Sequence, residues 1–201
     1  MRLGLTGSIA TGKSTIATIL LEKGAQLVDA DRIARDIVQP GSPLLNEIAL
    51  QFGEQVILPD GTLDRKALGQ IIFENEARKK QLNELMHPAI RAEMKRQIAE
   101  YEAMNPNGLI VVDVPLLYES NLVEWFDAVM LAYVPQRIQI QRLMARDGIS
   151  EENAKKRVFS QIDIEQKKQR ADIVINNSNT VDETRQQIDT YWKQKGFGSS
   201  S

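Results

Sequence analysis

The residues best suited to chemistry lie near the start of the chain, in the stretch GSIATGKST at positions 7–15. Gly7, Gly12, Lys13 and Ser14 match the pattern G-x-x-x-x-G-K-[ST], which binds nucleotide phosphates when it lies between a strand and a helix. Glycines let main-chain N–H groups approach phosphate oxygens, because they lack a Cβ atom and adopt conformations that strain other residues. The pattern therefore predicts a site for a nucleoside triphosphate. A glycine-rich turn with a solvated lysine is the alternative.

Each polar side chain of this loop has an expected task. Lys13 reaches the β and γ phosphates, and Ser14 can coordinate Mg²⁺. Thr15 can donate a hydrogen bond to the α phosphate, and the N-terminus of the following helix adds partial positive charge. The predicted nucleotide-binding loop comprises Gly7, Ala10, Thr11, Gly12, Lys13, Ser14 and Thr15.

Such a loop needs a strand before it and a helix behind it, and the surrounding pattern predicts both. Short apolar runs rich in β-branched residues alternate with helical patterns, which indicates βαβ units and a parallel sheet buried on both faces. The runs lie at residues 2–6, 25–29, 109–114, 128–134 and 172–177. We expect a doubly wound α/β fold with a five-stranded parallel sheet.

Two segments depart from this alternation. The interval between the second and third runs has helical patterns at residues 29–38, 42–53, 64–73, 76–86 and 88–104. Pro88 would open the last helix, where its missing N–H matters little, and His87 would fix that start. Residues 137–170 carry nine basic and five acidic side chains and form the cationic segment of the chain.

Composition excludes several classes of function. The chain has 201 residues, with 25 basic and 27 acidic side chains, and its net charge of −2 gives no global attraction to nucleic acid or an anionic membrane. Because the chain has no cysteine, disulfides and thiolate metal sites are excluded, and with one histidine we do not expect a histidine zinc site. No apolar stretch approaches the roughly 18 residues that span a bilayer. We expect a cytoplasmic protein, monomeric or weakly homo-oligomeric.

The phosphate pattern leaves open how the nucleotide is used. A GTPase would need an N-K-x-D guanine reader and a D-x-x-G switch, and an ABC-type ATPase an L-S-G-G-Q-like stretch, none of which fits this sequence. A small-molecule kinase needs an acceptor unit, a carboxylate near the acceptor hydroxyl and cations that close over the phosphoryl group. The helical insertion, the carboxylates Asp29 and Asp31 after the second strand, and the cationic segment meet these needs.

Longer motifs narrow the choice. The stretches GLTGSIATGKST, DADRIARDIVQPGSPLL, FGEQVILPDGTLDRKALGQIIF, LNELMHPAIR, VVDVPLLYE, QRLMARDGISEENAKKR and ADIVINN occur in this order. Over nearly the whole chain they resemble the dephospho-CoA kinase family. The resemblance implies that ATP, with Mg²⁺, donates its γ-phosphoryl group to the ribose 3′-hydroxyl of dephospho-CoA, giving CoA and ADP in the last step of coenzyme A biosynthesis. A nucleoside monophosphate kinase and a nucleotide-dependent binding module remain alternatives.

The resemblance also divides the chain. It implies a P-loop kinase fold with a helical substrate-binding insertion and a lid. The expected parts are a nucleotide-binding core of residues 1–29, 105–136 and 171–195, a helical acceptor domain of residues 30–104 and a lid of residues 137–170. The tail GFGSSS, residues 196–201, has no periodicity, and we expect it to be disordered.

A set of three residues is expected to be catalytic. Asp31 matches the family's acidic residue near the acceptor hydroxyl, where a carboxylate accepts or orients the proton. Lys13 and Arg142 would act on the transferring phosphoryl group. As an alternative, Asp31 would cap the helix that follows it, although Asp29 is the better cap or a second anchor for the substrate.

Further binding roles are expected. Asp113 ends an apolar strand and would hold Mg²⁺ directly or through water, or else bond to local main chain. Arg142 and Arg146, four residues apart, share a helix face and would clamp the polyphosphate, unless that face is simply solvated. Asn176 would lie near the adenine or form a strand-end turn. The pyrophosphate of dephospho-CoA, or else solvent, would meet Arg32, Arg35, Arg65 and Lys66.

Overall fold

Two compact units make up the chain. The computed structural model describes residues 1–73 and 75–197. The unit that we call the sheet unit comprises Met1–Val28 and Tyr101–Ser201, and the helical unit comprises Asp29–Glu100. No helix within the described residues is long and apolar enough to cross a membrane.

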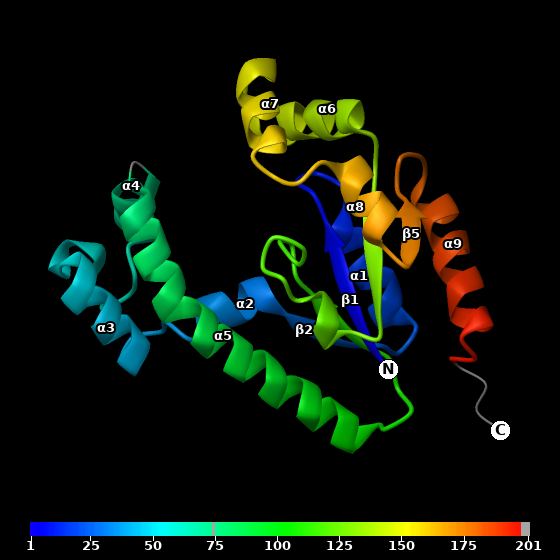
Figure 1. The fold of residues 1–201 in the computed structure, drawn as a ribbon, viewed down its shortest axis with the longest axis horizontal. Helices are drawn as coiled ribbons and strands as arrows, with labels where there is room; N and C mark the ends of the chain where they lie inside the picture. The colour runs from blue at the N-terminus through cyan, green and yellow to red at the C-terminus, as the bar shows by residue number, and fades with distance from the viewer. Residues whose placement is uncertain (74, 198–201) are drawn as a thin grey trace. The chain divides into compact units, whose positions relative to one another are not determined.

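A parallel sheet dominates the sheet unit. Its five strands follow the order β2-β3-β1-β4-β5. β1 pairs in parallel with β3 and β4, and β4 pairs in parallel with β5. Each strand end lies within one residue of its predicted run, which confirms the α/β fold (Figure 1). The strands are β1 (Arg2–Gly7), β2 (Gln26–Asp29), β3 (Ile110–Asp113), β4 (Ala128–Tyr133) and β5 (Ile173–Asn176).

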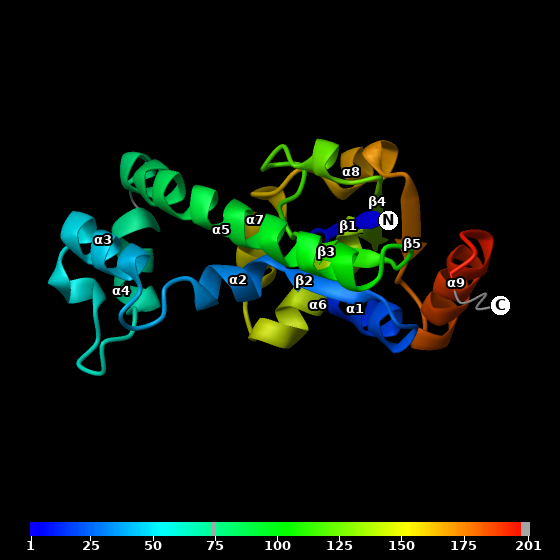
Figure 2. The same cartoon turned by 90° about the horizontal axis from the view of Figure 1, so that it is seen from below.

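Helices cover both faces of this sheet. α1 (Lys13–Glu22) and α9 (Val181–Gln194) lie on one face, and α8 (Ile164–Arg170) lies on the other (Figure 2). Met130 of β4 belongs to the core shared with α1 and α9, whereas its neighbour Leu131 packs against α8. Because side chains of a strand alternate between two covered faces, the strands are largely apolar on both.

Two further helices lie beyond the carboxyl end of β4 (Figure 1). They are α6 (Gln136–Asp147) and α7 (Glu151–Phe159), joined through Gly148, whose φ of 64° is a left-handed conformation that favours glycine. The small core between these helices also contacts Ile9 and Ala10 of the phosphate-binding loop. The helices expected to form the lid therefore pack against the loop.

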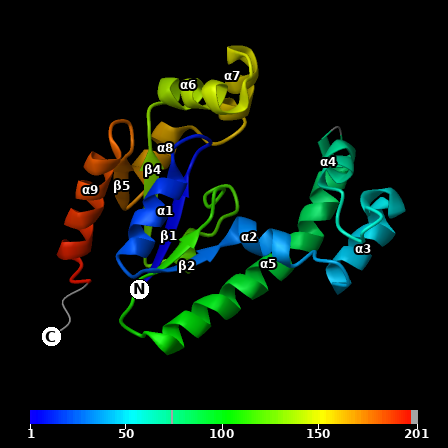
Figure 3. The same ribbon diagram turned by 180° about the vertical axis from the view of Figure 1, so that it is seen from behind.

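The helical unit has a core of its own. α2 (Ala30–Asp36), α3 (Pro43–Phe52) and α4 (Arg65–Phe73) precede the long α5 (Glu76–Met104), and a short 3-10 helix covers Glu54–Val56. One apolar cluster joins α3, α4 and the first part of α5, which lie side by side in Figure 3. This cluster supports the short helices, which would be marginal alone.

One helix differs from its prediction. The segment expected as two helices, the second starting at Pro88, is a single helix of 29 residues with Pro88 inside it. His87 therefore lies within the helix and does not fix a helix start. An internal proline removes a main-chain hydrogen bond and typically costs about 3 kcal/mol. Packing of Leu82, Leu85 and Met86 into the core of the helical unit offsets that cost.

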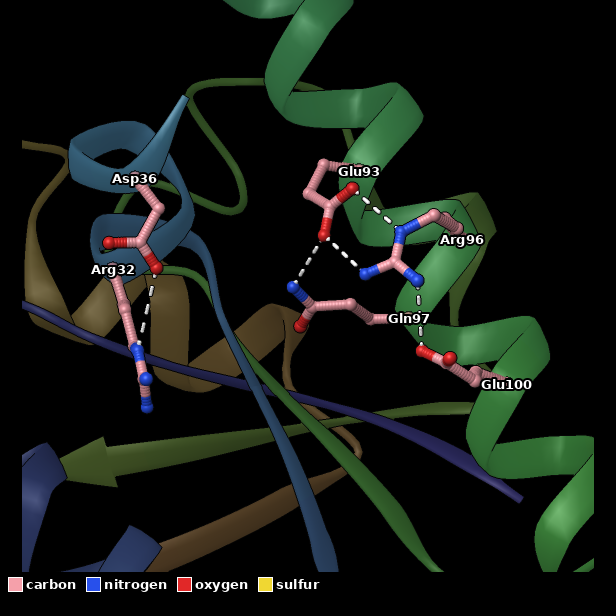
Figure 4. A network of polar contacts seen from close by, with 6 residues as sticks. All are labelled: Arg32, Asp36, Glu93, Arg96, Gln97 and Glu100. Atoms are coloured by element: carbon pink, nitrogen blue, oxygen red, sulfur yellow. Dashed lines mark hydrogen bonds and ion pairs between the residues drawn. The ribbon is translucent and has the colours of Figure 1, made fainter. Parts of the chain in front are cut away.

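The surface of α5 carries a network of charges (Figure 4). Arg96 pairs with Glu93 at 2.8 Å and with Glu100 at 3.0 Å, and Gln97 donates to Glu93 at 2.8 Å. The hydrogen bonds from Arg96 and then Gln97 lower the pKa of Glu93 to about 2. Ion pairs with these helical spacings stabilise a helix by roughly 0.2–0.5 kcal/mol each.

The chain end differs in part from the predicted disordered tail. The rings of Trp192 and Phe197 lie 5.2 Å apart, and the N–H of Phe197 donates to the carbonyl of Trp192. The prediction is therefore wrong for Gly196 and Phe197, because the aromatic contact packs this segment on α9. Residues 198–201 lie outside the described residues.

Candidate active site

The loop between β1 and α1 has no room for a Cβ atom at two of its glycines. Gly12 has a φ of 76°, and a Cβ atom added there would collide with Nδ2 of Asn177. A Cβ atom on Gly7 would lie 2.5 Å from Oγ1 of Thr11. Ala10, with a φ of 62°, takes a conformation that is strained for a residue with a Cβ atom. Both glycines of the phosphate-binding pattern are thus needed by the fold of the loop itself.

α1 begins directly after this loop. Its N-cap is Gly12, which has no side chain to accept the first N–H groups of the helix. These groups and the positive end of the helix dipole favour a bound anion. Ser14 is exposed in the first turn, and Thr15 is half-buried there. The start of α1 therefore has the geometry of a phosphate site.

Lys13, at the start of α1, meets Asp113, at the end of β3. The two side chains form an ion pair, and Asp113 is buried. Mg²⁺ prefers oxygen ligands, and the Asp113 carboxylate and the Ser14 hydroxyl have that chemistry. Within the described part of the chain, no three Asp, Glu, His or Cys side chains cluster around a metal position. Phosphates and water would have to supply the remaining ligands.

The two candidate arginines of α6 point to different partners. The Arg142 guanidinium donates to the carbonyl of Asn177 at 2.8 Å, and it lies 3.8 Å from the position of a Cβ atom on Gly12. Arg146 instead pairs with Asp147 at 2.7 Å and holds the pKa of that carboxyl below its usual range. The structure therefore places Arg142 beside the loop, whereas Arg146 pairs with Asp147.

The two asparagines that follow the last buried residue of β5 also differ. The Asn176 carboxamide oxygen accepts from the N–H and hydroxyl of Ser178, at 3.0 and 2.6 Å, as in a strand-end turn. Asn177 is buried, donates to the carbonyl of Thr11 at 2.9 Å and accepts from Thr184 at 2.8 Å. Sequence reasoning singled out Asn176 and missed its neighbour, which fastens the loop. The adenine contact of Asn176 stays a prediction.

A second set of loop contacts was also missed. Lys167 of α8 is fully buried, pairs with Glu119 at 2.8 Å and donates to the carbonyl of Gly7 at 3.3 Å. The Gln161 side chain accepts from the N–H of Ile9 at 2.9 Å. Glu119 belongs to the motif VVDVPLLYE, but no pattern distinguishes a buried lysine from the exposed lysines around it.

Two carboxylates near the start of α2 have distinct surroundings within the helical unit. Asp29 is the N-cap, and its side chain accepts from the N–H of Arg32 at 3.0 Å. Asp31 lies in the first turn with an exposed side chain. The prediction of Asp29 as the better cap is confirmed, and the alternative of Asp31 as the cap is wrong. The helix begins at Ala30, which places Asp31 two positions after the N-cap residue.

The cations of the helical unit lie on two helices. Arg32 pairs loosely with Asp36 within α2, at 3.5 Å, as Figure 4 shows. Arg65 and Lys66 open α4, at a hollow of about 680 Å³ on its surface. The hollow is lined by Arg65, Lys66, Gly69, Gln70 and Phe73, of which Phe73 is 86% exposed. This hollow combines cationic and aromatic groups, as a ligand with anionic and apolar parts would require.

Comparisons with known proteins cover both units. A family model described as dephospho-CoA kinase matches residues 1–183. A dephospho-CoA kinase of Shouchella clausii is 49% identical over 188 residues, which is 94% of this chain and 95% of the relative. The structure of dephospho-CoA kinase from Campylobacter jejuni is similar with a TM-score of 0.76 and 34% identity, covering 99% of this chain and 98% of that chain. A Thermus thermophilus protein is similar with a TM-score of 0.82 and 27% identity, covering 96% and 97% of the two chains.

Proposed function

Since the chain belongs to the dephospho-CoA kinase family, we propose that it transfers the γ-phosphoryl group of ATP to the ribose 3′-hydroxyl of dephospho-CoA. The products are CoA and ADP, and the reaction is the last step of coenzyme A biosynthesis. The observation that carries the proposal is the complete phosphate-binding loop in a chain that the family model matches from residue 1 to residue 183.

In this proposal ATP binds at the start of α1. Main-chain N–H groups of the loop and the Lys13 ammonium hold its β and γ phosphates, and Thr15 bonds the α phosphate. The ion pair with Asp113 keeps Lys13 at the site before the nucleotide arrives. Ser14 and Asp113 would hold Mg²⁺, which neutralises phosphate charge when it is bound.

Arg142 is proposed to stabilise the transferring phosphoryl group. A guanidinium there offsets the negative charge of the phosphoryl oxygens as the bond to ADP breaks. The position of Arg142 beside Gly12 supports this role. Arg146 is the weaker candidate, because its guanidinium is already paired with Asp147, which also pairs with Arg157.

Asp31 is proposed to take the proton from the acceptor hydroxyl. As the 3′-oxygen attacks the γ-phosphorus, the carboxylate accepts the hydroxyl proton and the phosphoryl group leaves ADP. Two observations support this role: Asp29 already caps α2, and the Asp31 carboxylate is exposed. Capping of α2, the main alternative role for Asp31, therefore does not engage its carboxylate.

The α4 hollow is proposed to hold the diphosphate end of the acceptor. The diphosphate of dephospho-CoA carries negative charge, and Arg65 and Lys66 are exposed cations without an ion-pair partner among the described residues. Phe73, at the other end of the hollow, offers apolar surface to the pantetheine arm. Arg32 and Arg35 are further candidates for the same charge.

Acceptor dependence of ADP release tests the proposal. The purified protein is supplied with ATP and Mg²⁺ together with dephospho-CoA, AMP, CMP or no acceptor, and ADP is measured over time. We expect rapid release only with dephospho-CoA. Equal rates with AMP or CMP would support a nucleoside monophosphate kinase, and a slow rate that no acceptor changes would support a nucleotide-dependent binding module.

A further inference from the structure

A buried lysine connects the end of the cationic segment to the phosphate-binding loop. Lys167 lies three residues after Ile164 on α8, and both side chains are buried against the sheet unit. The Lys167 ammonium has no exposed surface, pairs with Glu119 and donates to the carbonyl of Gly7. The other lysine pairs of this segment, such as Lys156 with Glu152, are largely exposed. Lys167 is therefore set apart from the solvated charges around it.

Such a pair is an inefficient way to stabilise a fold. Taking two charges out of water is costly, and well-packed apolar side chains of similar volume often stabilise a protein as well or better. Glu119 is also incompletely satisfied: its Oε1 accepts from Lys167 and from the N–H of Ile162, whereas its Oε2 is buried with no hydrogen-bond partner among the described residues. The contacts that the pair makes with the phosphate-binding loop therefore explain it better than any contribution to the free energy of folding.

What it holds is the main chain of the loop. Lys167 bonds the carbonyl of Gly7, and Gln161, six residues earlier, bonds the N–H of Ile9. Asn177 bonds the carbonyl of Thr11 from another part of the sheet unit. These three bonds engage main-chain groups of the loop ahead of Gly12 and do not use the N–H groups of Lys13 and Ser14 at the start of α1.

The same contacts divide the segment that was expected to be the lid. Residues 161–167 are tied to the loop and to Glu119, and α8 packs on β4. α6 and α7 lie beyond the strand end, where Arg142 is bonded to Asn177 (Figure 1). Within this segment, a closing movement over ATP would involve α6 and α7, whose contacts with Ile9, Ala10 and Asn177 would have to change.

We propose that Lys167 and Glu119 are a positioning pair, which holds the phosphate-binding loop ready for ATP and makes residues 161–170 a fixed base beneath helices α6 and α7. The proposal rests on ATP binding at the loop, which belongs to the proposed function. A loop that is already ordered loses less conformational entropy when it binds its ligand. Without the pair, part of the binding free energy of ATP is spent on ordering the loop. The affinity for ATP therefore falls, while KM for dephospho-CoA stays unchanged.

The double variant Lys167→Met/Glu119→Gln tests the pair. It removes both charges together, whereas Lys167→Met alone would leave the partly buried Glu119 carboxylate without its cation. We expect the dissociation constant and KM for ATP to rise about tenfold or more, with KM for dephospho-CoA changed less than about twofold. The matched control is Lys156→Met/Glu152→Gln, which neutralises an exposed pair of the same segment and should leave all three constants unchanged. An unchanged ATP affinity in a cooperatively folded double variant would overturn the proposal.

Hydrogen exchange of the unaltered enzyme tests the fixed base even if the double variant does not fold. Amide exchange is followed with and without a non-hydrolysable ATP analogue. We expect residues 161–170 to be protected in both states, and residues 140–159 to gain protection with the analogue. An equal gain in both segments would overturn the fixed base. Failure of the unaltered enzyme to bind the analogue would instead overturn the proposed function.

Discussion

The nucleotide and acceptor halves of the proposed site are built in different ways. In the sheet unit, the loop is held by side chains far away in sequence, such as Asn177 and Lys167, which reach it across 166 and 160 residues. In the helical unit, Asp31, Arg65 and Lys66 are exposed, and their charges serve no ion pair within the described residues. The nucleotide half is therefore built before its ligand arrives, whereas the acceptor half keeps its charges in water. Substitutions in the nucleotide half should therefore change different kinetic constants from substitutions in the acceptor half.

The largest effect is expected at Lys13. Lys13→Ala removes the cation that holds the β and γ phosphates, so turnover should become undetectable while unfolding stays cooperative. Steady-state kinetics and a thermal melt measure the two properties. If the variant keeps more than about a tenth of the wild-type kcat, a loss below ~1.4 kcal/mol, the role of Lys13 is wrong.

The next effect is expected at Asp31 and concerns the acceptor half. Asp31→Asn keeps the size of the side chain but removes its ability to accept a proton, so kcat should fall by about 10²–10⁴-fold. The thermal midpoint and the dissociation constant for ATP should barely change, because Asp29 caps the helix.

Asp36→Asn is the matched control for Asp31, since it removes the same charge from an exposed position of the same helix. It should retain nearly full kcat. A fall smaller than tenfold in Asp31→Asn would move the proton-accepting role to another carboxylate, with Asp113 as the next candidate.

A smaller effect is expected at the α4 hollow. Arg65→Ala removes an exposed cation from the proposed diphosphate site, so KM for dephospho-CoA should rise about tenfold with little change in KM for ATP. Lys80→Ala, at an exposed position of α5, is the control and should behave as the wild type. An equal rise in both KM values would show that Arg65 does not belong to the acceptor half alone.

The smallest effect concerns the stability of α5. The folded-state pKa of Glu93, about 2, lies below its ordinary value of 4.5, so this carboxylate stabilises the fold above pH 4.5 and loses that contribution as the pH falls toward 2. Because Arg96 is 58% exposed, solvent screening limits the effect to less than about 1 kcal/mol.

Urea unfolding of Glu93→Gln between pH 6 and pH 2.5 measures this contribution. The variant should be less stable than the wild type near pH 6 and should approach it near pH 2.5. Glu84→Gln, on the same helix, is the control. A constant difference across the pH range would assign the effect to packing.

The sequence predicted the fold well because its strongest signals are local. Strands buried on both faces are continuous apolar runs, Gly12 has a left-handed backbone that other residues adopt only with strain, and Gly7 has no room for a Cβ atom. Pro88 misled the prediction because a local preference gave way to tertiary packing around Leu85 and Met86.

The missed site residues have a different cause. Asn176 and Asn177 are chemically identical, and the sequence does not say which of them reaches the loop. Burial of Lys167 depends on how α8 packs on the sheet, and the residues next to Lys167 in the sequence do not predict that packing. Asp29 and Asp31 have the same side chain, and only the exact residue at which α2 begins assigns the capping role to Asp29.

The central claim is that phosphoryl transfer ends on the ribose 3′-hydroxyl of dephospho-CoA. Phosphorus-31 NMR of the product formed from ATP and dephospho-CoA tests it most directly. The account predicts one new phosphomonoester resonance coupled to the ribose H3′, in an amount equal to the ADP released, with the diphosphate resonances of the acceptor retained. A resonance coupled to H2′, or ADP accompanied by free phosphate and unmodified dephospho-CoA, would contradict it.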